Sequence, residues 1–226
     1  MLPFVLSVIA GATDIIGFLG LNGLFTSHIT GNLVVLAAHI VTGEPTMFSY
    51  ILSVPVFMLV LFLTRLLAGA FEQAGRDTLG PLLLLQLFSL AAFLVLCITA
   101  GPWINPNAAT AIIAGMFGVA AMAVQNALVQ IALRNTPTTA VMTTNVTHFM
   151  LDLGRVLVGG DPAEVAKAHS RAVHILPVIA GFATGCGLGA AFEAAAGLWS
   201  LALPTGLALL AFAMAWRHGN NIAQRR

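Results

Sequence analysis

Six apolar stretches of twenty or more residues constrain this chain more than any other feature. Of its 226 residues, 59% are hydrophobic and 8% are charged, whereas soluble domains average roughly 45–50% and 25%. A helix of about 20 apolar residues crosses the ~30 Å hydrocarbon layer of a bilayer. The sequence therefore predicts an all-α integral membrane protein. Nine basic against eight acidic residues leave no basic face for nucleic acid, so a nucleic-acid partner is not expected.

Two further elements differ from the six long apolar ones. The eight hydrophobic elements cover residues 3–25, 29–42, 47–71, 80–100, 107–132, 138–158, 174–196 and 198–217. The second has only about 14 residues, roughly 21 Å as a helix, which is short for a span. The sixth carries several polar and charged residues. We expect six transmembrane helices plus two short half-helices or re-entrant elements.

An internal repeat organises these elements. The segment 27–32, SHITGN, matches 140–145, AVMTTN, at an offset of 113 residues. Two further pairs of segments match in the same order, 54–56 with 176–178 and 69–72 with 190–193, at offsets of 122 and 121. The sequence therefore predicts one membrane domain built from two repeats of about 113 residues, 1–106 and 107–226.

The basic residues indicate how the repeats are oriented. If the two short elements do not cross, all nine Lys and Arg residues fall at one face, which the positive-inside tendency places in the cytoplasm. Eight crossings would move Arg65, Arg76 and Arg134 outside. Six crossings with both termini cytoplasmic are therefore favoured, and the halves become inverted repeats, an architecture typical of transporters and channels. A crossing 29–42 element with an outside N-terminus would leave the other loops unchanged, and only the repeat argues against it.

Polar residues at membrane depth are the candidate site. Asp14 lies near the middle of the first span, where an ionised carboxylate costs at least ~2.5 kcal/mol on insertion scales. The two matching motifs can open half-helices, because Thr and Asn side chains cap helix starts. If both start near the midplane, their polar groups converge into a solute site. The other interpretation makes each motif an ordinary cap at the interface. The predicted substrate-binding residues are Asp14, Thr30, Asn32, Gln125, Asn126, Thr143 and Asn145.

Histidines and charged pairs have weaker interpretations. Asp14, His28 and His148 are candidates for proton coupling, although the histidines do not match in the repeat. Asp152 and Arg155 are three residues apart and are expected to pair on one helix face. Neither a Cys/His metal cluster nor a nucleophile beside a base is readable, so we expect no metal, no cofactor and no enzyme activity.

The whole chain resembles the YoaK-type family of bacterial membrane proteins, domain of unknown function 1275. The resemblance rests on Gly11, Asp14, 17–19, Gly23, Phe25, 27–32, 125–127, 137–139, 141–147 and 152–153. The sequence departs from the family pattern at Thr144 and His148, where Gly and Gln are usual. The resemblance implies a six-span protein of the bacterial inner membrane and supplies no settled substrate.

The sequence thus predicts a small secondary transporter or channel for a neutral or cationic polar solute, with Asp14 as a candidate proton-coupling group. The alternative is a non-transporting membrane protein, an assembly or stress-response partner whose polar residues hold helices together. The expected partners are the lipid bilayer and a small polar solute, and the sequence is compatible with a homo-oligomer.

Overall fold

The structure, a computed structural model, describes the backbone of residues 1–43, 48–101, 105 and 107–223, and side chains as far as residue 217. Within these residues it is all-helical, without strands. The helices are α1 (Leu2–Gly20), α2 (Ile29–Thr42), α3 (Phe48–Gln73), α4 (Leu79–Ala100), α5 (Ala109–Ala132), α6 (Met142–Val158), α7 (Pro162–Ala196), the 3₁₀ helix η1 (Gly197–Leu201) and α8 (Ala202–Ala223). Arg225, Arg226 and the repeat boundary predicted at residue 106 lie outside the described residues.

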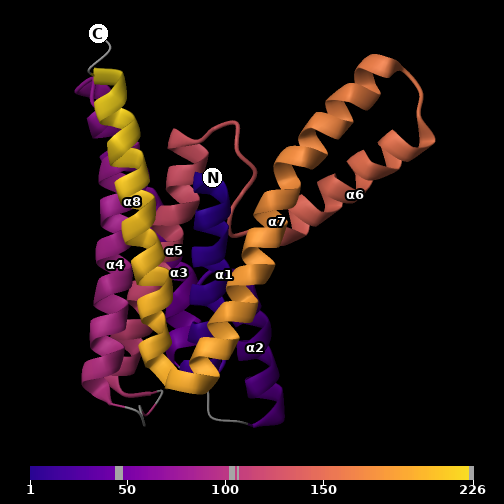
Figure 1. Cartoon of the computed structure of the whole chain (residues 1–226). Coiled ribbons are helices and arrows are strands. Elements are labelled where there is room, and N and C mark those ends of the chain that lie inside the picture. Colours follow the sequence, from indigo (N-terminus) through magenta and orange to yellow (C-terminus); the bar gives the residue numbers. More distant parts are fainter. Residues whose placement is uncertain (44–47, 102–104, 106, 224–226) are drawn as a thin grey trace.

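Most helices form one bundle, and one helical hairpin projects from it. α7 and α8 run antiparallel and are joined by η1 at one end of the bundle (Figure 1). α6 and the first half of α7 form the hairpin, which we call the arm. The described C-terminal end lies at the same end of the bundle as the tip of the arm (Figure 1).

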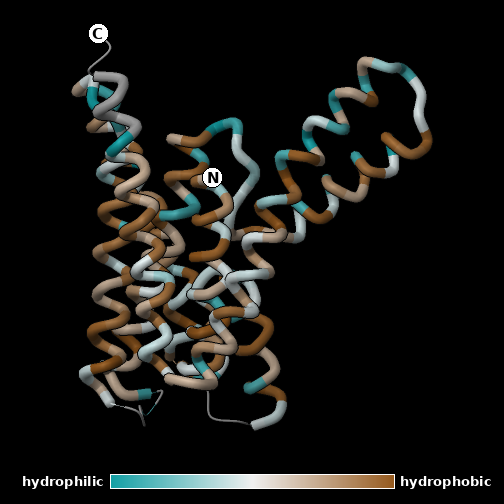
Figure 2. The backbone as a smooth tube through the Cα atoms, in the orientation of Figure 1, coloured by the Kyte–Doolittle hydropathy of each residue, from teal (hydrophilic) through white to brown (hydrophobic). Residues whose placement is uncertain are grey.

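The surface of the bundle is apolar, as expected for a membrane protein. Five helical stretches are long and apolar enough to cross a bilayer: α1, α3, α4, α5 and the stretch Pro162–Arg217, which contains α7, η1 and most of α8. Figure 2 shows hydrophobic residues along the bundle helices, with hydrophilic residues at the end where the described chain ends, after α5 and on the arm. The chain is therefore a membrane-type helical protein.

Several helix boundaries differ from the sequence prediction, and those of α1 and α7 bear on the site. α1 ends at Gly20, five residues before the predicted end at residue 25, because the chain reverses after it. α7 begins at Pro162, twelve residues before the predicted start at residue 174. The Asp161 side chain accepts a hydrogen bond from the Ala163 N–H at 3.2 Å, and proline suits the first helical position because its missing N–H needs no partner there.

The helix packing is preserved when the two halves are exchanged. α1 packs against α7 and α8, and α5 packs against the corresponding helices α3 and α4. α2 contacts α3 as α6 contacts α7, while α4 contacts α8. When α1–α4 are exchanged with α5–α8 in order, each packing pair becomes another pair in this set. The α4–α8 pair becomes itself.

Glycines let α1 and α7 approach backbone to backbone. A Cβ built on Gly185 would lie 2.2 Å from the carbonyl oxygen of Val8, and one on Gly11 would lie 2.3 Å from that of Phe182. Side chains cannot occupy such space, so only glycine permits this approach. Small residues at close helix contacts are typical of membrane bundles, where packing rather than water exclusion drives association.

Candidate functional site

The chain breaks between α1 and α2 and is tied back to the middle of α1. Asn22 and Gly23 have φ angles of 53° and 91°, which reverse the chain. The Asp14 Oδ1 atom then accepts hydrogen bonds from the N–H groups of Thr26 at 2.8 Å and Ser27 at 2.7 Å. These N–H groups precede α2 and have no partner within that helix. Buried Asp14 therefore anchors the start of α2 beside α1.

A second buried side chain closes the same break. Asn32, on the first turn of α2, accepts a hydrogen bond from the Phe25 N–H at 2.9 Å and donates one to the Phe25 carbonyl at 2.8 Å. Its amide thus replaces a backbone partner on both sides of Phe25. In the irregular segment before α2, this supplies hydrogen bonds that lipid cannot.

The break before α6 is closed at the matching position. The side-chain nitrogen of Asn145 donates a hydrogen bond to the carbonyl of Thr138 at 2.6 Å. The Thr138 hydroxyl in turn donates to the Asn145 Oδ1 atom at 3.5 Å. Both asparagines thus hold the residue seven positions upstream (32 − 25 = 7 and 145 − 138 = 7). The matching motifs therefore form matching local structures, although Thr144 stands where the first copy has Gly31.

The two breaks meet. The Ser27 hydroxyl donates to the carbonyl of Ala140 at 3.5 Å. These residues occupy matching places in the two sequence motifs (140 − 27 = 113), each two positions before its helix. The segments that precede α2 and α6 are therefore neighbours.

Gln125 ties the second break to the bundle. Its side-chain nitrogen donates to the Leu6 carbonyl at 2.8 Å and to the Thr139 hydroxyl at 2.9 Å, and its oxygen accepts from Gln86 Nε2 at 2.6 Å. Gln125 thus anchors the second break as Asp14 anchors the first. Its neighbour Asn126 instead donates to the Met122 carbonyl of its own helix.

Gln86 is the member of this network that the sequence interpretation missed. It is fully buried on α4, and its side-chain oxygen has no partner among the described residues. A lone glutamine within an otherwise apolar span was the available signal, because such a residue needs a polar partner inside the bundle.

The side chains of the remaining predicted residues are exposed at the edge of this network, and the backbone N–H of His28 donates to Asp14 Oδ1 at 3.4 Å. Thr30 and Thr143 are exposed on the first turns of α2 and α6. His28 immediately precedes α2 and His148 lies on α6, and both are exposed. Of the seven predicted substrate-binding residues, the structure thus buries Asp14, Asn32, Gln125 and Asn145 around the two breaks, half-buries Asn126, and leaves the two threonines outside.

Comparison with known families now identifies the chain. A family model described as "Protein of unknown function (DUF1275)" matches residues 2–214. The chain belongs to this family. No curated protein and no solved structure gave a match. In this DUF1275 chain, the two polar motifs are held in place by the hydrogen bonds of Asp14, Asn32 and Asn145.

A cavity of about 510 Å³ lies beside the second break of the DUF1275 chain. It is bounded by the 134–137 segment, Asn145, His148 and the α7 residues Ser170, Arg171, His174 and Ile175. The cavity therefore reaches one end of the buried network, at Asn145. Most residues that line it are of polar type, among them two arginines and two histidines, although carbon atoms supply most of the exposed lining surface; no described carboxylate lines the cavity.

Arg171 is neutralised by an ion pair that differs from the predicted one. Asp152 was expected to pair with Arg155, but its carboxylate accepts hydrogen bonds from Arg171 Nε at 3.1 Å and Nη2 at 2.5 Å. The tertiary fold of the arm brings α7 against α6, whereas Arg155 is exposed on α6. Arg171 lowers the pKa of the Asp152 carboxyl, which lies on α6 and outside the five candidate spans.

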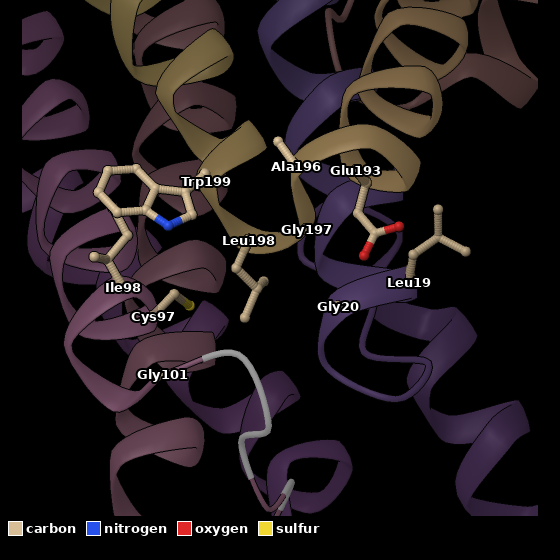
Figure 3. Close-up of a pocket in the computed structure, with 10 residues that line it drawn as sticks. All are labelled: Leu19, Gly20, Cys97, Ile98, Gly101, Glu193, Ala196, Gly197, Leu198 and Trp199. Atoms are coloured by element: carbon tan, nitrogen blue, oxygen red, sulfur yellow. The ribbon is translucent and has the colours of Figure 1, made fainter.

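A second cavity, of about 350 Å³, lies at the end of the DUF1275 bundle where α7 and α8 are joined (Figure 1), and Figure 3 shows the residues that line it. The end of α1, the end of α4 and the turn around η1 surround it, and Glu193 contributes its carboxylate. Among the described residues, no group of three or more His, Cys, Asp or Glu side chains is placed to hold a metal ion.

Proposed function

We propose that this protein transports a small polar solute across the bacterial inner membrane. The observation that carries the proposal is the contact between Ser27 and Ala140, which joins two broken segments at equivalent repeat positions. Broken helices that meet from opposite halves are the arrangement in which many secondary transporters bind their solutes.

In this proposal the chain crosses the membrane six times. The stretch Pro162–Arg217 supplies two crossings, because α7 and α8 are antiparallel (Figure 1). α2 and α6 are re-entrant half-helices, since their starts are tied to Asp14 and Gln125 inside α1 and α5. The symmetric packing pairs support treating the halves as inverted repeats.

The basic residues support a cytoplasmic position for both termini. The end of α3, the start of α4, the end of α5, the tip of the arm and the end of α8 all lie at one end of the molecule (Figure 1). These segments carry the Lys and Arg residues at positions 65, 76, 134, 155, 167, 171 and 217. The positive-inside tendency assigns this end to the cytoplasm, so the 510 Å³ cavity opens inward.

The chemistry of the cavity favours a neutral solute over a cation. Arg134 and Arg171 line it, and each has an acidic neighbour, Glu72 at 3.8 Å and Asp152 at 2.5 Å. A cation would meet two guanidinium groups, whereas an anion would compete with carboxylates already in place. A small uncharged molecule with hydroxyl or amide groups matches the Asn, Ser, Thr and His side chains around it.

Asp14 is the candidate for coupling transport to protons. Among the described residues, Asp14 is the acidic residue whose side chain is buried inside the bundle. Its carboxylate accepts a hydrogen bond from the segment before α2, which must rearrange if α2 moves. We propose no catalytic role for the chain. The hydroxyls of Ser7, Ser27 and Ser53 each donate to a backbone carbonyl rather than to a base.

A second candidate function is assembly or stress response without transport. Asn32 favours this alternative, because it is fully buried and both the oxygen and the nitrogen of its amide already bind Phe25. In this case the buried polar residues serve only to hold the helices.

Osmotic measurements on proteoliposomes separate the two candidates. Vesicles carrying the purified protein are mixed with urea, glycerol or larger polyols, and their reswelling is followed by light scattering. Transport predicts faster reswelling for at least one solute than in protein-free vesicles. Substitution of Ser170 by Trp, which fills the inner cavity, should slow it, whereas Thr99→Val on the exposed face of α4 should not. Equal reswelling with and without protein would favour the non-transporting alternative.

A further inference from the structure

The two halves differ at the site of the 510 Å³ cavity, which lies in the second half and which we call the inner cavity. Given the proposed transport function and inverted repeat, this difference locates a gate. The cavity residues Arg134 and Asn135 correspond to Leu21 and Asn22 at an offset of 113 (134 − 21). On α7, the cavity residue Arg171 corresponds to Ser49 at the offset of 122 that relates Pro177 to Pro55 (177 − 55).

The place in the first half that corresponds to the inner cavity is closed. Leu21 and Ser49 are buried, whereas Arg134 and Arg171 are exposed. Tyr50 fills the space: it is 0% exposed and packs in one apolar cluster with Leu21 and Leu24. Its counterpart in the second half is Ala172 (172 − 50 = 122), which is buried beside the cavity residue Arg171 and has a methyl group in place of the phenol ring.

Polar contacts hold the Tyr50 ring against the first break. The phenol donates to the Asn22 carbonyl at 2.5 Å, and His39 of α2 meets the ring edge-on with centroids 5.5 Å apart. Gly23 is also required, because a Cβ there would lie 3.0 Å from the Tyr50 oxygen. Tyr50 thus joins α3, the break and α2 through one side chain.

The helix that carries Tyr50 has a built-in point of flexibility. Pro55 lies five residues further along α3 and removes one backbone hydrogen bond there, as Pro177 does in α7. The first turns of α3 can therefore move relative to the rest of the helix, and Tyr50 moves with them.

We propose that Tyr50 is the outer gate of the transport path, and that the structure is the inward-facing state. In this state the cavity beside the second break is open to the cytoplasm, and its counterpart on the outer side is closed by Tyr50. When Tyr50 leaves the Asn22 carbonyl, the outer vestibule opens between Leu21 and Ser49.

Cysteine accessibility in whole cells and inverted vesicles tests the gate without measuring flux. In a background with Cys97 and Cys186 replaced by Ala, Ser49→Cys should react slowly with a membrane-impermeant maleimide added outside. Tyr50→Ala should accelerate this reaction about tenfold or more, because losing a buried aromatic ring weakens the closed packing by more than the ~1.4 kcal/mol that equals tenfold. Tyr50→Phe keeps the ring but loses the bond to Asn22, so an intermediate rate is expected.

The reciprocal variant provides an independent test if Tyr50→Ala does not fold. Ala172→Tyr places a phenol ring at the position equivalent to Tyr50, beside the cavity residue Arg171, and should slow the labelling of Ile175→Cys from the cytoplasmic side at least threefold. The gate proposal is overturned if folded Tyr50→Ala and Ala172→Tyr proteins both label at parental rates. If the labelling changes as expected but no solute crosses, the vestibules stand and the transport proposal fails. If solute crosses with unchanged labelling, transport stands and Tyr50 is not the gate.

Discussion

Ser27 and Ala140, 113 residues apart in the chain, are joined by a hydrogen bond from the serine hydroxyl to the alanine carbonyl. The bond connects the segment before α2 to the segment before α6, so each irregular segment satisfies part of the other. Irregular backbone inside a bilayer requires such internal partners, because hydrocarbon offers none.

A crosslink should report this meeting point directly. With the native cysteines replaced, Ser27→Cys and Ala140→Cys in one chain should join on mild oxidation or with a short bifunctional reagent. Electrophoretic mobility measures the product, and Ser27→Cys paired with Leu157→Cys on the arm is the control. Failure of the 27/140 pair to react, in protein that elutes as a folded species, would contradict the convergence of the two breaks.

The glycine contact between α1 and α7 predicts a difference between two glycines on one helix. Gly185→Ala should lower the thermal midpoint in detergent, because its methyl group would overlap the Val8 carbonyl and overpacking typically costs about 1–3 kcal/mol. Gly187→Ala, with nothing within 4 Å of the new methyl group, should leave the midpoint unchanged or raise it. Equal midpoints for the two variants would show that the helices do not approach as described.

Asp14 can be tested as an anchor and as a proton carrier with two substitutions. Asp14→Leu removes the acceptor for Thr26 and Ser27, and each buried N–H left without a partner costs about 1–3 kcal/mol, so folded yield should fall sharply. Asp14→Asn keeps an acceptor oxygen and should fold. If Asp14 couples protons, the asparagine variant should lose the pH dependence of solute flux in proteoliposomes. Unchanged pH dependence would leave Asp14 with the anchoring role alone.

The ion pair on the arm predicts unequal effects of two arginines. Arg171→Gln should increase proteolysis or hydrogen exchange at the tip around Gly159 and Gly160, because Asp152 loses its bidentate partner. Arg155→Gln, the partner expected from spacing, should leave both unchanged. In the parent, the contribution of Asp152 is fully present above the ordinary Asp pKa near ~3.9 and is lost only as pH falls through its lowered pKa in the fold. Arm protection should therefore persist from neutral pH down to about pH 4.

Two exposed positions test the membrane topology. Thr42→Cys, at the end of α2, should react with an impermeant maleimide added outside intact cells, whereas Arg76→Cys, before α4, should react only in inverted vesicles. The expected contrast follows from placing the basic end in the cytoplasm. Reaction of Arg76→Cys from outside would contradict six crossings.

The sequence by itself determined the class of protein, the helical elements and the places where they break. Long apolar runs require a membrane, and the repeated polar motifs marked both broken segments, where Asn32 and Asn145 make matching contacts. These features are local, since they depend on the composition and order of neighbouring residues.

Only the tertiary structure decided which polar groups meet. Asp14 binds the N–H groups of Thr26 and Ser27 because the chain reverses between them, and Asp152 pairs with Arg171 because the arm folds α7 against α6. Helix rotation was also undetermined: Gln125 joins the buried network and its neighbour Asn126 does not. In a membrane, lipid-facing and protein-facing sides of a helix are both apolar, so the pattern of hydrophobic residues carries little information on which side a given polar residue faces.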